Sequence, residues 1–286
     1  MIDLELQRLV HVYPDGGVRA LDGVDLRIGP GERVALVGQN GSGKTTLVRH
    51  LNGLLRPTAG RVLVGGRDAA DSTVAQLARR VGLVFQDPDR QIFAGTVRAE
   101  VEFGPRNLGV RGADLRRAVV GSLSAVGLDR AESTNPYDLG ASRRKLLAIA
   151  SVLAMDTPAL VLDEPTTGQD ARGTQMVRGL VGRLSAEGRT VIAISHDMRF
   201  VAETFERVVV MRGGRVILDG SPREVFAPAA WPTLRSTHLE PPLAAVAGDR
   251  LALGATPTET ALVAALQSAR RGVEPDSRAA EGSTGQ

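Results

Sequence analysis

The sequence contains no cysteine, and this single absence excludes disulfides, thiolate nucleophiles and cysteine zinc sites. Aromatic residues make up only 3% of the 286 residues, which argues against a surface that stacks nucleic-acid bases. Lysine occurs only at Lys44 and Lys145, so the net charge of +3 comes from arginine spread along the chain. We therefore expect no nucleic-acid partner, and a protein suited to a reducing compartment.

Long apolar runs are also absent. The longest nearly apolar stretch, residues 146–155, has about half of the ~20 residues that a membrane helix needs. The first ten residues carry Asp3 and Glu5 where a signal peptide would be apolar. We expect a chain that by itself spans no membrane. Its hydrophobic content of 43% is enough for one large core, or one core plus an appendage.

Alternating apolar residues and a turn at 14–17 predict a β-rich opening, with strands over 18–28 and 33–37. From residue 44 onward helices and strands alternate, which predicts a parallel sheet covered on both faces. The helices are expected over 44–54 and 174–184, and the strands over 61–64, 81–85, 159–163 and 190–194. A hairpin over 207–212 and 215–219 follows.

Beyond residue 226 the composition shifts to proline, alanine and threonine, which predicts a linker or loosely packed appendage. One helix is predicted there, over 257–271, and the last dozen residues are expected to be disordered. Leu262, Leu266 and Ala269 form an apolar stripe that suits packing on its own domain or a dimer contact equally well. The N-cap, first helical residue, capping-box acid and terminator are predicted at Thr256, Pro257, Glu259 and Gly272.

The segment GQNGSGKT, residues 38–45, follows an apolar strand and has the spacing of a phosphate-binding P-loop. Its glycines allow backbone N–H groups to face an anion, and the helix that follows directs its positive end to the same place. Lys44 should reach the β and γ phosphates, and the Thr45 hydroxyl should hold Mg²⁺. A glycine-rich turn without a ligand is the other interpretation.

Two further strands end in polar residues that suit the same chemistry. Asp163 and Glu164 end one strand, and alternation should direct them to opposite faces: Asp163 suits magnesium, Glu164 an attacking water. His196 follows another strand and is interpreted as a γ-phosphate contact. Gln86 ends the strand before residue 87 and is a candidate for positioning water or magnesium. Without the P-loop, each would be interpreted as a structural or solvated side chain.

Three consecutive cations, residues 143–145, begin a predicted helix whose N-terminus already carries positive partial charge. Each exposed cation there costs roughly 0.3 to 1 kcal/mol unless an anion lies opposite. The anion is either a ligand or a nearby carboxylate such as Asp138.

Together these segments resemble the ATP-binding subunits of ABC transporters, from about residue 4 to 226. The resemblance implies a P-loop α/β core with an antiparallel β-subdomain and a helical subdomain over about 88–150. The ATP-binding domain would span residues 1–227, with an extension over 228–286. ATP and Mg²⁺ are the implied cofactors, and the implied phosphate-binding residues are Gly38, Asn40, Gly41, Ser42, Gly43, Lys44, Thr45 and Thr46.

The resemblance also implies individual roles. Gln86 would couple to the membrane partner, and Asp163 would bind Mg²⁺. Glu164 would be the general base, and His196 would hold the γ-phosphate. Two contacts complete the implied set, adenine stacking by Tyr13 and dimer contact by the loop of Asp170.

The segment LGASR, residues 139–143, stands where the family has its signature LSGGQ. There the helix N-terminus caps the γ-phosphate held by the other subunit, so that phosphate is the implied anion. Gly140, Ala141 and Ser142 replace the usual serine and two glycines. We hypothesise a weakened half-site that faces a different ATPase subunit, with Ser142 supplying a displaced hydroxyl.

Residues 85–109 are similar to the ATPases of energy-coupling factor transporters, which import vitamins and transition metals. Phe93, Val97, Val101 and Phe103 would then line a groove for a helix of the membrane subunit, or else form the subdomain core. The implied function is ATP hydrolysis that energises such an importer by dimer closure, at the cytoplasmic face of the membrane. The implied partners are an integral membrane subunit and a second ATPase, identical or different. Alternatives are an ordinary ABC importer or exporter, or a hydrolysis-impaired partner in a heterodimer.

Overall fold

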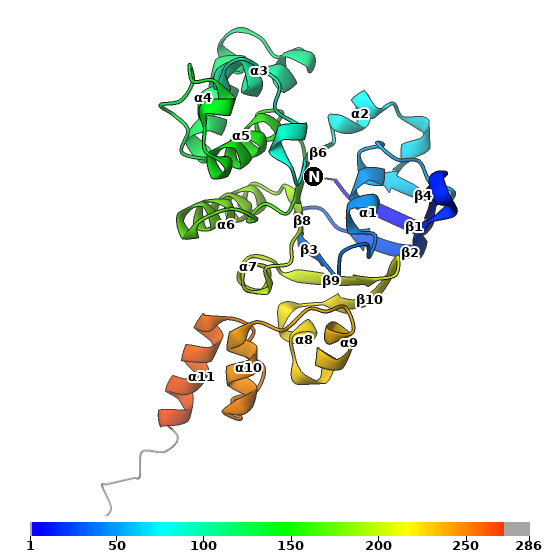
Figure 1. The fold of residues 1–286 in the computed structure, drawn as a ribbon, viewed down its shortest axis with the longest axis vertical. Coiled ribbons are helices and arrows are strands. Elements are labelled where there is room, and N and C mark those ends of the chain that lie inside the picture. Colours follow the sequence, from blue (N-terminus) through cyan, green and yellow to red (C-terminus); the bar gives the residue numbers. More distant parts are fainter. Residues whose placement is uncertain (1, 272–286) are drawn as a thin grey trace, which may run out of the picture.

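The computed structural model describes residues 2–271 as two sheets with helices around them (Figure 1). The first sheet is antiparallel, in the order β2-β1-β4-β5. This confirms the predicted β-rich opening. Its strands are β1 (Leu4–Val12), β2 (Arg19–Ile28), β4 (Ala59–Val64) and β5 (Arg67–Asp68).

The second sheet carries the ends of the motif strands. Its order is β10-β9-β3-β8-β7-β6, and every neighbouring pair is parallel except β9 with β10. The predicted spans of four of these strands agree with the structure. The strands are β3 (Arg33–Val37), β6 (Val81–Val84), β7 (Ala159–Asp163), β8 (Thr190–Ile194), β9 (Arg207–Arg212) and β10 (Arg215–Gly220).

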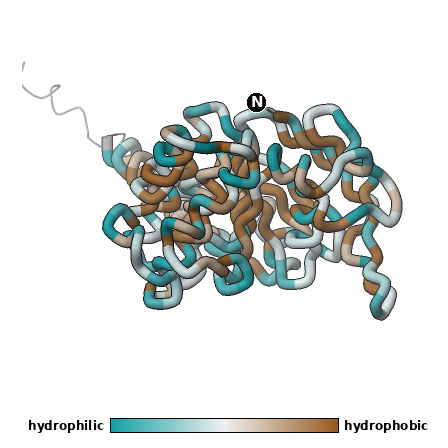
Figure 2. Tube along the Cα trace, turned by 90° about the horizontal axis from the view of Figure 1, so that it is seen from above, coloured by the Kyte–Doolittle hydropathy of each residue, from teal (hydrophilic) through white to brown (hydrophobic). Residues whose placement is uncertain are grey.

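Both faces of this sheet are covered, and its central strands are apolar at nearly every position. Alternate residues of β3 enter different cores: Val34 and Leu36 pack with the antiparallel sheet and α1 (Lys44–Leu51). Ala35 and Val37 belong to the other core, which most of the later helices build. Figure 2 shows hydrophobic segments concentrated in the interior of the molecule. Such two-sided burial is why a continuous apolar run, and not an alternating one, encodes these strands.

The helical subdomain consists of α3 (Val97–Asn107), α4 (Gly112–Ala125) and α5 (Ala141–Leu153), grouped at one end of the molecule (Figure 1). Of the two interpretations of the four apolar residues, groove lining or subdomain core, the structure supports the core for two of them. Val97 and Val101 are fully buried in the core, whereas Phe93 and Phe103 are 59% and 48% exposed. The two exposed rings contact each other edge to face.

Three further helices border strands of the parallel sheet in the chain. A short helix, α2 (Val74–Ala78), precedes β6, while α6 (Ala171–Ala186) and α7 (Met198–Thr204) flank β8 in the chain. The helix predicted over 174–184 begins earlier because the Asp170 carboxylate caps it, accepting a hydrogen bond from the N–H of Gly173. Among residues 2–271, none of the helices combines the length and hydrophobicity needed to cross a bilayer.

A short helix, α8 (Pro222–Val225), follows β10. Beyond residue 226 the expectation of a linker with one helix was wrong, because the described residues there form three α-helices: α9 (Trp231–Arg235), α10 (Leu243–Arg250) and α11 (Glu259–Arg271). The last two lie side by side (Figure 1). Along α11 the predicted stripe is largely open, since Leu266 is 37% exposed. The predicted terminator Gly272 and the predicted disordered tail lie outside the described residues.

The predicted N-cap of the last helix was also wrong. Thr256 is buried, and its hydroxyl donates to the carbonyl of Ala244 on α10. The cap is Thr258, whose hydroxyl accepts from the N–H of Ala261, so no capping box forms with Glu259. Pro257 therefore lies before the helix. The Thr256 hydroxyl forms a tertiary hydrogen bond in place of the helix cap that the local sequence pattern predicts.

We predict that Thr256→Val loosens the extension, because it removes the buried hydrogen bond at nearly constant volume. The loss should be about 1 kcal/mol, seen as roughly fivefold faster amide hydrogen exchange in α10 and α11. Thr260→Val makes the same chemical change on an exposed residue of α11 and should leave exchange unchanged. Equal exchange in both variants would contradict this role of Thr256.

Candidate functional site

The P-loop lies between β3 and α1 and has a backbone that only glycine tolerates at its key positions. Gly38, Gly41 and Gly43 have positive φ values of 146°, 78° and 102°. A Cβ on Gly38 would lie 2.2 Å from the carbonyl oxygen of Met211, and one on Gly43 would lie 2.5 Å from that of Ala20. Close contact with β9 and β2 therefore fixes the loop.

Lys44 begins α1, and its ammonium group lies inside the P-loop. Nζ donates to the carbonyl oxygens of Gly38 and Gln39, at 2.7 and 2.9 Å, and to the hydroxyl of Ser42 at 3.3 Å. Burial lowers the pKa of Lys44, while the charges of Glu164 and Asp163 act against that shift. A positive charge is thus held beneath the N-terminus of a helix, as an anion site requires.

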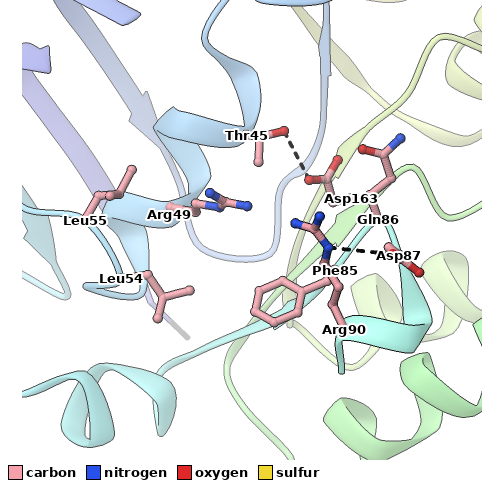
Figure 3. Close-up of a pocket in the computed structure, with 9 residues that line it drawn as sticks. All are labelled: Thr45, Arg49, Leu54, Leu55, Phe85, Gln86, Asp87, Arg90 and Asp163. Atoms are coloured by element: carbon pink, nitrogen blue, oxygen red, sulfur yellow. Dashed lines mark hydrogen bonds and ion pairs between the residues drawn. The ribbon is translucent and has the colours of Figure 1, made fainter. Parts of the chain in front are cut away.

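Two of the three predicted magnesium ligands, Thr45 and Asp163, lie together; the third is Gln86. The Thr45 hydroxyl donates to Oδ2 of Asp163 at 3.1 Å (Figure 3). Burial raises the pKa of Asp163, and the hydrogen bond from Thr45 opposes this shift. A hydroxyl and a carboxylate oxygen are ligands that Mg²⁺ prefers, so the donor set fits that ion.

Glu164 and His196 form a second pair beside the first. Nδ1 of His196 lies 2.8 Å from Oε2 of Glu164, and the Thr167 hydroxyl donates to the same oxygen at 3.3 Å. The Glu164 side chain is largely buried, while His196 is exposed. Strand alternation does not separate the two acids, because β7 ends at Asp163 and Glu164 has a left-handed φ of 51°. This conformation positions a carboxylate that can polarise a water molecule.

Gln86 follows β6 and borders a cavity of about 500 Å³ next to Asp163 and Thr45 (Figure 3). The other lining residues come from α1 and the segment after it, and from both sides of Gln86; they are Arg49, Leu54, Leu55, Phe85, Asp87 and Arg90. Sequence reasoning missed Gln91, whose amide accepts from the N–H of Phe85 and donates to Ala148 O on α5. A lone glutamine in a loop gives no signal of such a contact.

The three cations at the start of α5 do not share one anion. Arg144 forms an ion pair with Asp89, Nε to Oδ1 3.2 Å, so Asp138 was the wrong carboxylate. Lys145 is buried, and its ammonium group donates to the carbonyl oxygens of Gln86 and Asp163. Arg143 is exposed. The expectation of a phosphate facing all three was therefore wrong for two of them.

The altered signature segment is bonded within its own chain. The Ser142 hydroxyl donates to Oε1 of Gln169 at 2.8 Å, and Nε2 of Gln169 donates to Ser142 O at 3.0 Å. Gln169 precedes Asp170, the cap of α6, and stands where the resemblance to ABC ATPases implies a leucine. Two departures from the family pattern, which look unrelated in sequence, are thus partners in the fold.

Asn40, Gly140 and Ala141 of the predicted set are exposed. The predicted base contact, Tyr13, lies beside the start of α1. Its hydroxyl is 3.0 Å from Oγ1 of Thr46, the last residue of the predicted phosphate-binding set. The structure thus brings one predicted base contact to the predicted phosphate site. The phosphate, base and catalytic roles of these residues stay predictions.

Known proteins match this framework. The family described as ABC transporter matches residues 21–167. This chain belongs to that family. The energy-coupling factor transporter ATP-binding protein EcfA2 of Symbiobacterium thermophilum is 44% identical over 247 residues, which cover 84% of this chain and 85% of that protein. The corresponding EcfA of Methanocaldococcus jannaschii is 40% identical over 244 residues, 85% of this chain and 86% of that protein.

Solved structures agree. cbiO1 from Clostridium perfringens, part of the ABC transporter complex cbiONQ, has a TM-score of 0.72 and 36% identity, and the match covers 82% of this chain and 94% of that chain. The dimeric cassette MJ0796 bound to ADP and Pi has a TM-score of 0.70 and 27% identity, covering 76% and 98%. These likenesses confirm the predicted fold class and family. The chain is an ATP-hydrolysing ABC subunit.

In this ABC ATPase we predict energetic coupling between Ser142 and Gln169. Ser142→Ala and Gln169→Leu should each destabilise the fold, and the double variant should lose about 1 kcal/mol less than the sum, because both changes remove the same hydrogen bond. Urea unfolding measures the three values. Ser142→Ala with Gln175→Leu, an exposed glutamine on α6, is the additive control. Strict additivity for both pairs would contradict the coupling.

Proposed function

We propose that this chain is the ATPase subunit of an energy-coupling factor importer, which takes up a vitamin or a transition-metal ion. The carrying observation is the site itself, with Thr45 beside Asp163 and Glu164 beside His196 at one sheet edge. The EcfA2 and EcfA names of relatives that match most of the chain support the importer type.

ATP binds with its phosphates in the P-loop, where Lys44 transfers its hydrogen bonds from the loop carbonyls to the β and γ phosphates. Thr45 and Asp163 hold Mg²⁺, which when bound neutralises charge on the same phosphates. Glu164 orients and polarises the attacking water, and His196 contacts the γ-phosphate from the other side of that carboxylate. The 2.8 Å contact between these two side chains supports their acting as one unit.

A second ATPase subunit completes the site. The N-terminus of α5 caps the γ-phosphate of ATP that the partner cassette holds, and the exposed Arg143 adds positive charge there. ATP closes the pair, and hydrolysis opens it. Since the Ser142 hydroxyl is engaged by Gln169, the half-site offered by this chain has backbone N–H donors but no free hydroxyl. This supports a heterodimer in which the partner supplies the stronger half-site.

The membrane partner docks at the helical subdomain, on the cytoplasmic face of the membrane. Phe93 and Phe103 present two exposed rings in contact with each other, and Glu100 fixes the loop of Phe93 by accepting the N–H groups of Phe93 and Ala94. An apolar anchor on a rigid support is what a partner helix needs.

We expect Glu164→Gln to lower kcat of the assembled transporter by at least about 100-fold, because it removes the general base. ATP binding, measured by calorimetry, should persist. Glu187→Gln, at an exposed residue beyond α6, should keep full turnover. Normal hydrolysis by Glu164→Gln would contradict the assignment.

We expect a protein with several membrane spans to co-purify with the tagged full chain from detergent-solubilised membranes. The double change Phe93→Asp and Phe103→Asp should reduce its recovery about tenfold, since it removes both apolar anchors. Val120→Asp, at a residue of α4 that is 48% exposed, should not. Equal recovery from all three would show that docking lies elsewhere.

A further inference from the structure

Two buried histidines lie behind the P-loop, and the catalytic scheme above does not use them. His11, on β1, is 6% exposed, and His50, on α1, is 1% exposed. Nε2 of His50 lies 3.2 Å from Nδ1 of His11, and Nδ1 of His50 lies 2.7 Å from the carbonyl oxygen of Thr46. The imidazoles therefore connect β1 to the first turn of α1.

The partners fix the direction of each hydrogen bond. A carbonyl oxygen only accepts, so Nδ1 of His50 carries a proton and donates to Thr46 O. Burial lowers the pKa of His50, which leaves its Nε2 as an acceptor. Nδ1 of His11 then donates, with His50 Nε2 and the carbonyl oxygen of Arg56 both at 3.2 Å. One arrangement of protons satisfies this chain of contacts.

The series of contacts from Thr46 through His50 and His11 leads to Tyr13. The ring of His11 meets the ring of Tyr13 edge to face, with centroids 4.6 Å apart at 83°. At its other end the Tyr13 hydroxyl is 3.0 Å from Oγ1 of Thr46. Thr46 is thus bonded to Tyr13 through its side chain and to His50 through its carbonyl oxygen. The tyrosine is therefore held both through its ring, by His11, and through its hydroxyl, by Thr46.

We propose that His11 and His50 are positioning residues that orient the ring of Tyr13 for stacking on the adenine of ATP. The inference rests on the proposed function, in which Tyr13 contacts the base. Neither histidine touches the nucleotide. Each acts by removing rotational freedom from Tyr13 before ATP binds, which lowers the entropic cost of stacking.

Such a role affects only the part of the affinity that comes from the base. Tripolyphosphate occupies the P-loop but has no base, so it separates ring positioning from P-loop integrity. His11→Leu should raise the Kd for ATP by about three- to tenfold, the range of an aromatic contact, and leave the Kd for tripolyphosphate unchanged. The KM for ATP should rise in parallel, with kcat unchanged. Calorimetry on the full chain and turnover by the assembled transporter measure these values.

Two amide variants of His50 serve as matched controls. His50→Gln places an amide oxygen near the position of Nε2, where it can accept from His11, and should restore wild-type ATP affinity. His50→Asn places an amide nitrogen near the position of Nδ1 and retains only the bond to Thr46 O. Its ATP affinity should fall like that of His50→Leu.

Tyr13→Ala separates the possible failures. In that background His11→Leu should have no further effect on ATP affinity, because the ring it orients is gone. Weaker ATP binding by Tyr13→Ala together with unchanged binding by His11→Leu would overturn the positioning role alone. Unchanged ATP binding by Tyr13→Ala would overturn the base contact itself, and the positioning role with it, while Glu164→Gln still tests hydrolysis. Equal losses of ATP and tripolyphosphate by His11→Leu would show that the histidines only maintain the P-loop fold.

Discussion

The carboxylate of Asp163 is buried at the end of β7, and the site is organised around that charge. Thr45 donates to it from α1, while the ammonium of Lys145 lies against the carbonyl oxygen of the same residue. Burial lowers the pKa of Lys44 and of Lys145, and in both cases the charges of Glu164 and Asp163 oppose the shift. Two buried acids and two buried lysines thus stabilise one another, and this mutual compensation joins P-loop, sheet and helical subdomain. Removing any one of the four would leave the others less well compensated in a medium where charge is costly.

The strands at the site were predictable because the residues of each strand carry the pattern that identifies it. β7 is apolar from its first residue to the one before Asp163, as a strand buried on both faces requires. The P-loop was predictable for the same reason, since Gly38 and Gly43 report backbone conformations and close contacts that no other residue accepts. The predictions that failed were those in which a tertiary contact decides the role of a residue. Thr256 has a perfect local setting for a cap, yet a carbonyl on α10 competes for its hydroxyl, and no pattern within α11 could reveal that.

The cations at the start of α5 show that tertiary contacts also decide the roles of residues at the site. In sequence they form one cluster with one implied ligand, but the helix turns each side chain by about 100° from its neighbour. Arg144 therefore meets Asp89, and Lys145 turns inward to the sheet. Ser142 and Gln169 are a further case. Ser142 brings a hydroxyl and Gln169 an amide to positions where the family pattern has neither, and the two residues are 27 apart in sequence. The reason for both becomes visible only in the fold, where the loop before α6 lies against α5 and the two side chains bond. Pairs of unusual residues carry information that neither member carries alone.

The scarcity of lysine has a practical consequence. Both lysine side chains lie at the candidate site, and they are only 8% and 3% exposed. Amine-directed labels and cross-linkers, which in most proteins modify many surface lysines, would have no exposed lysine to modify here. Acylation of Lys44 or Lys145 would instead report transient opening of the candidate site, so a general reagent would become a selective probe of that opening.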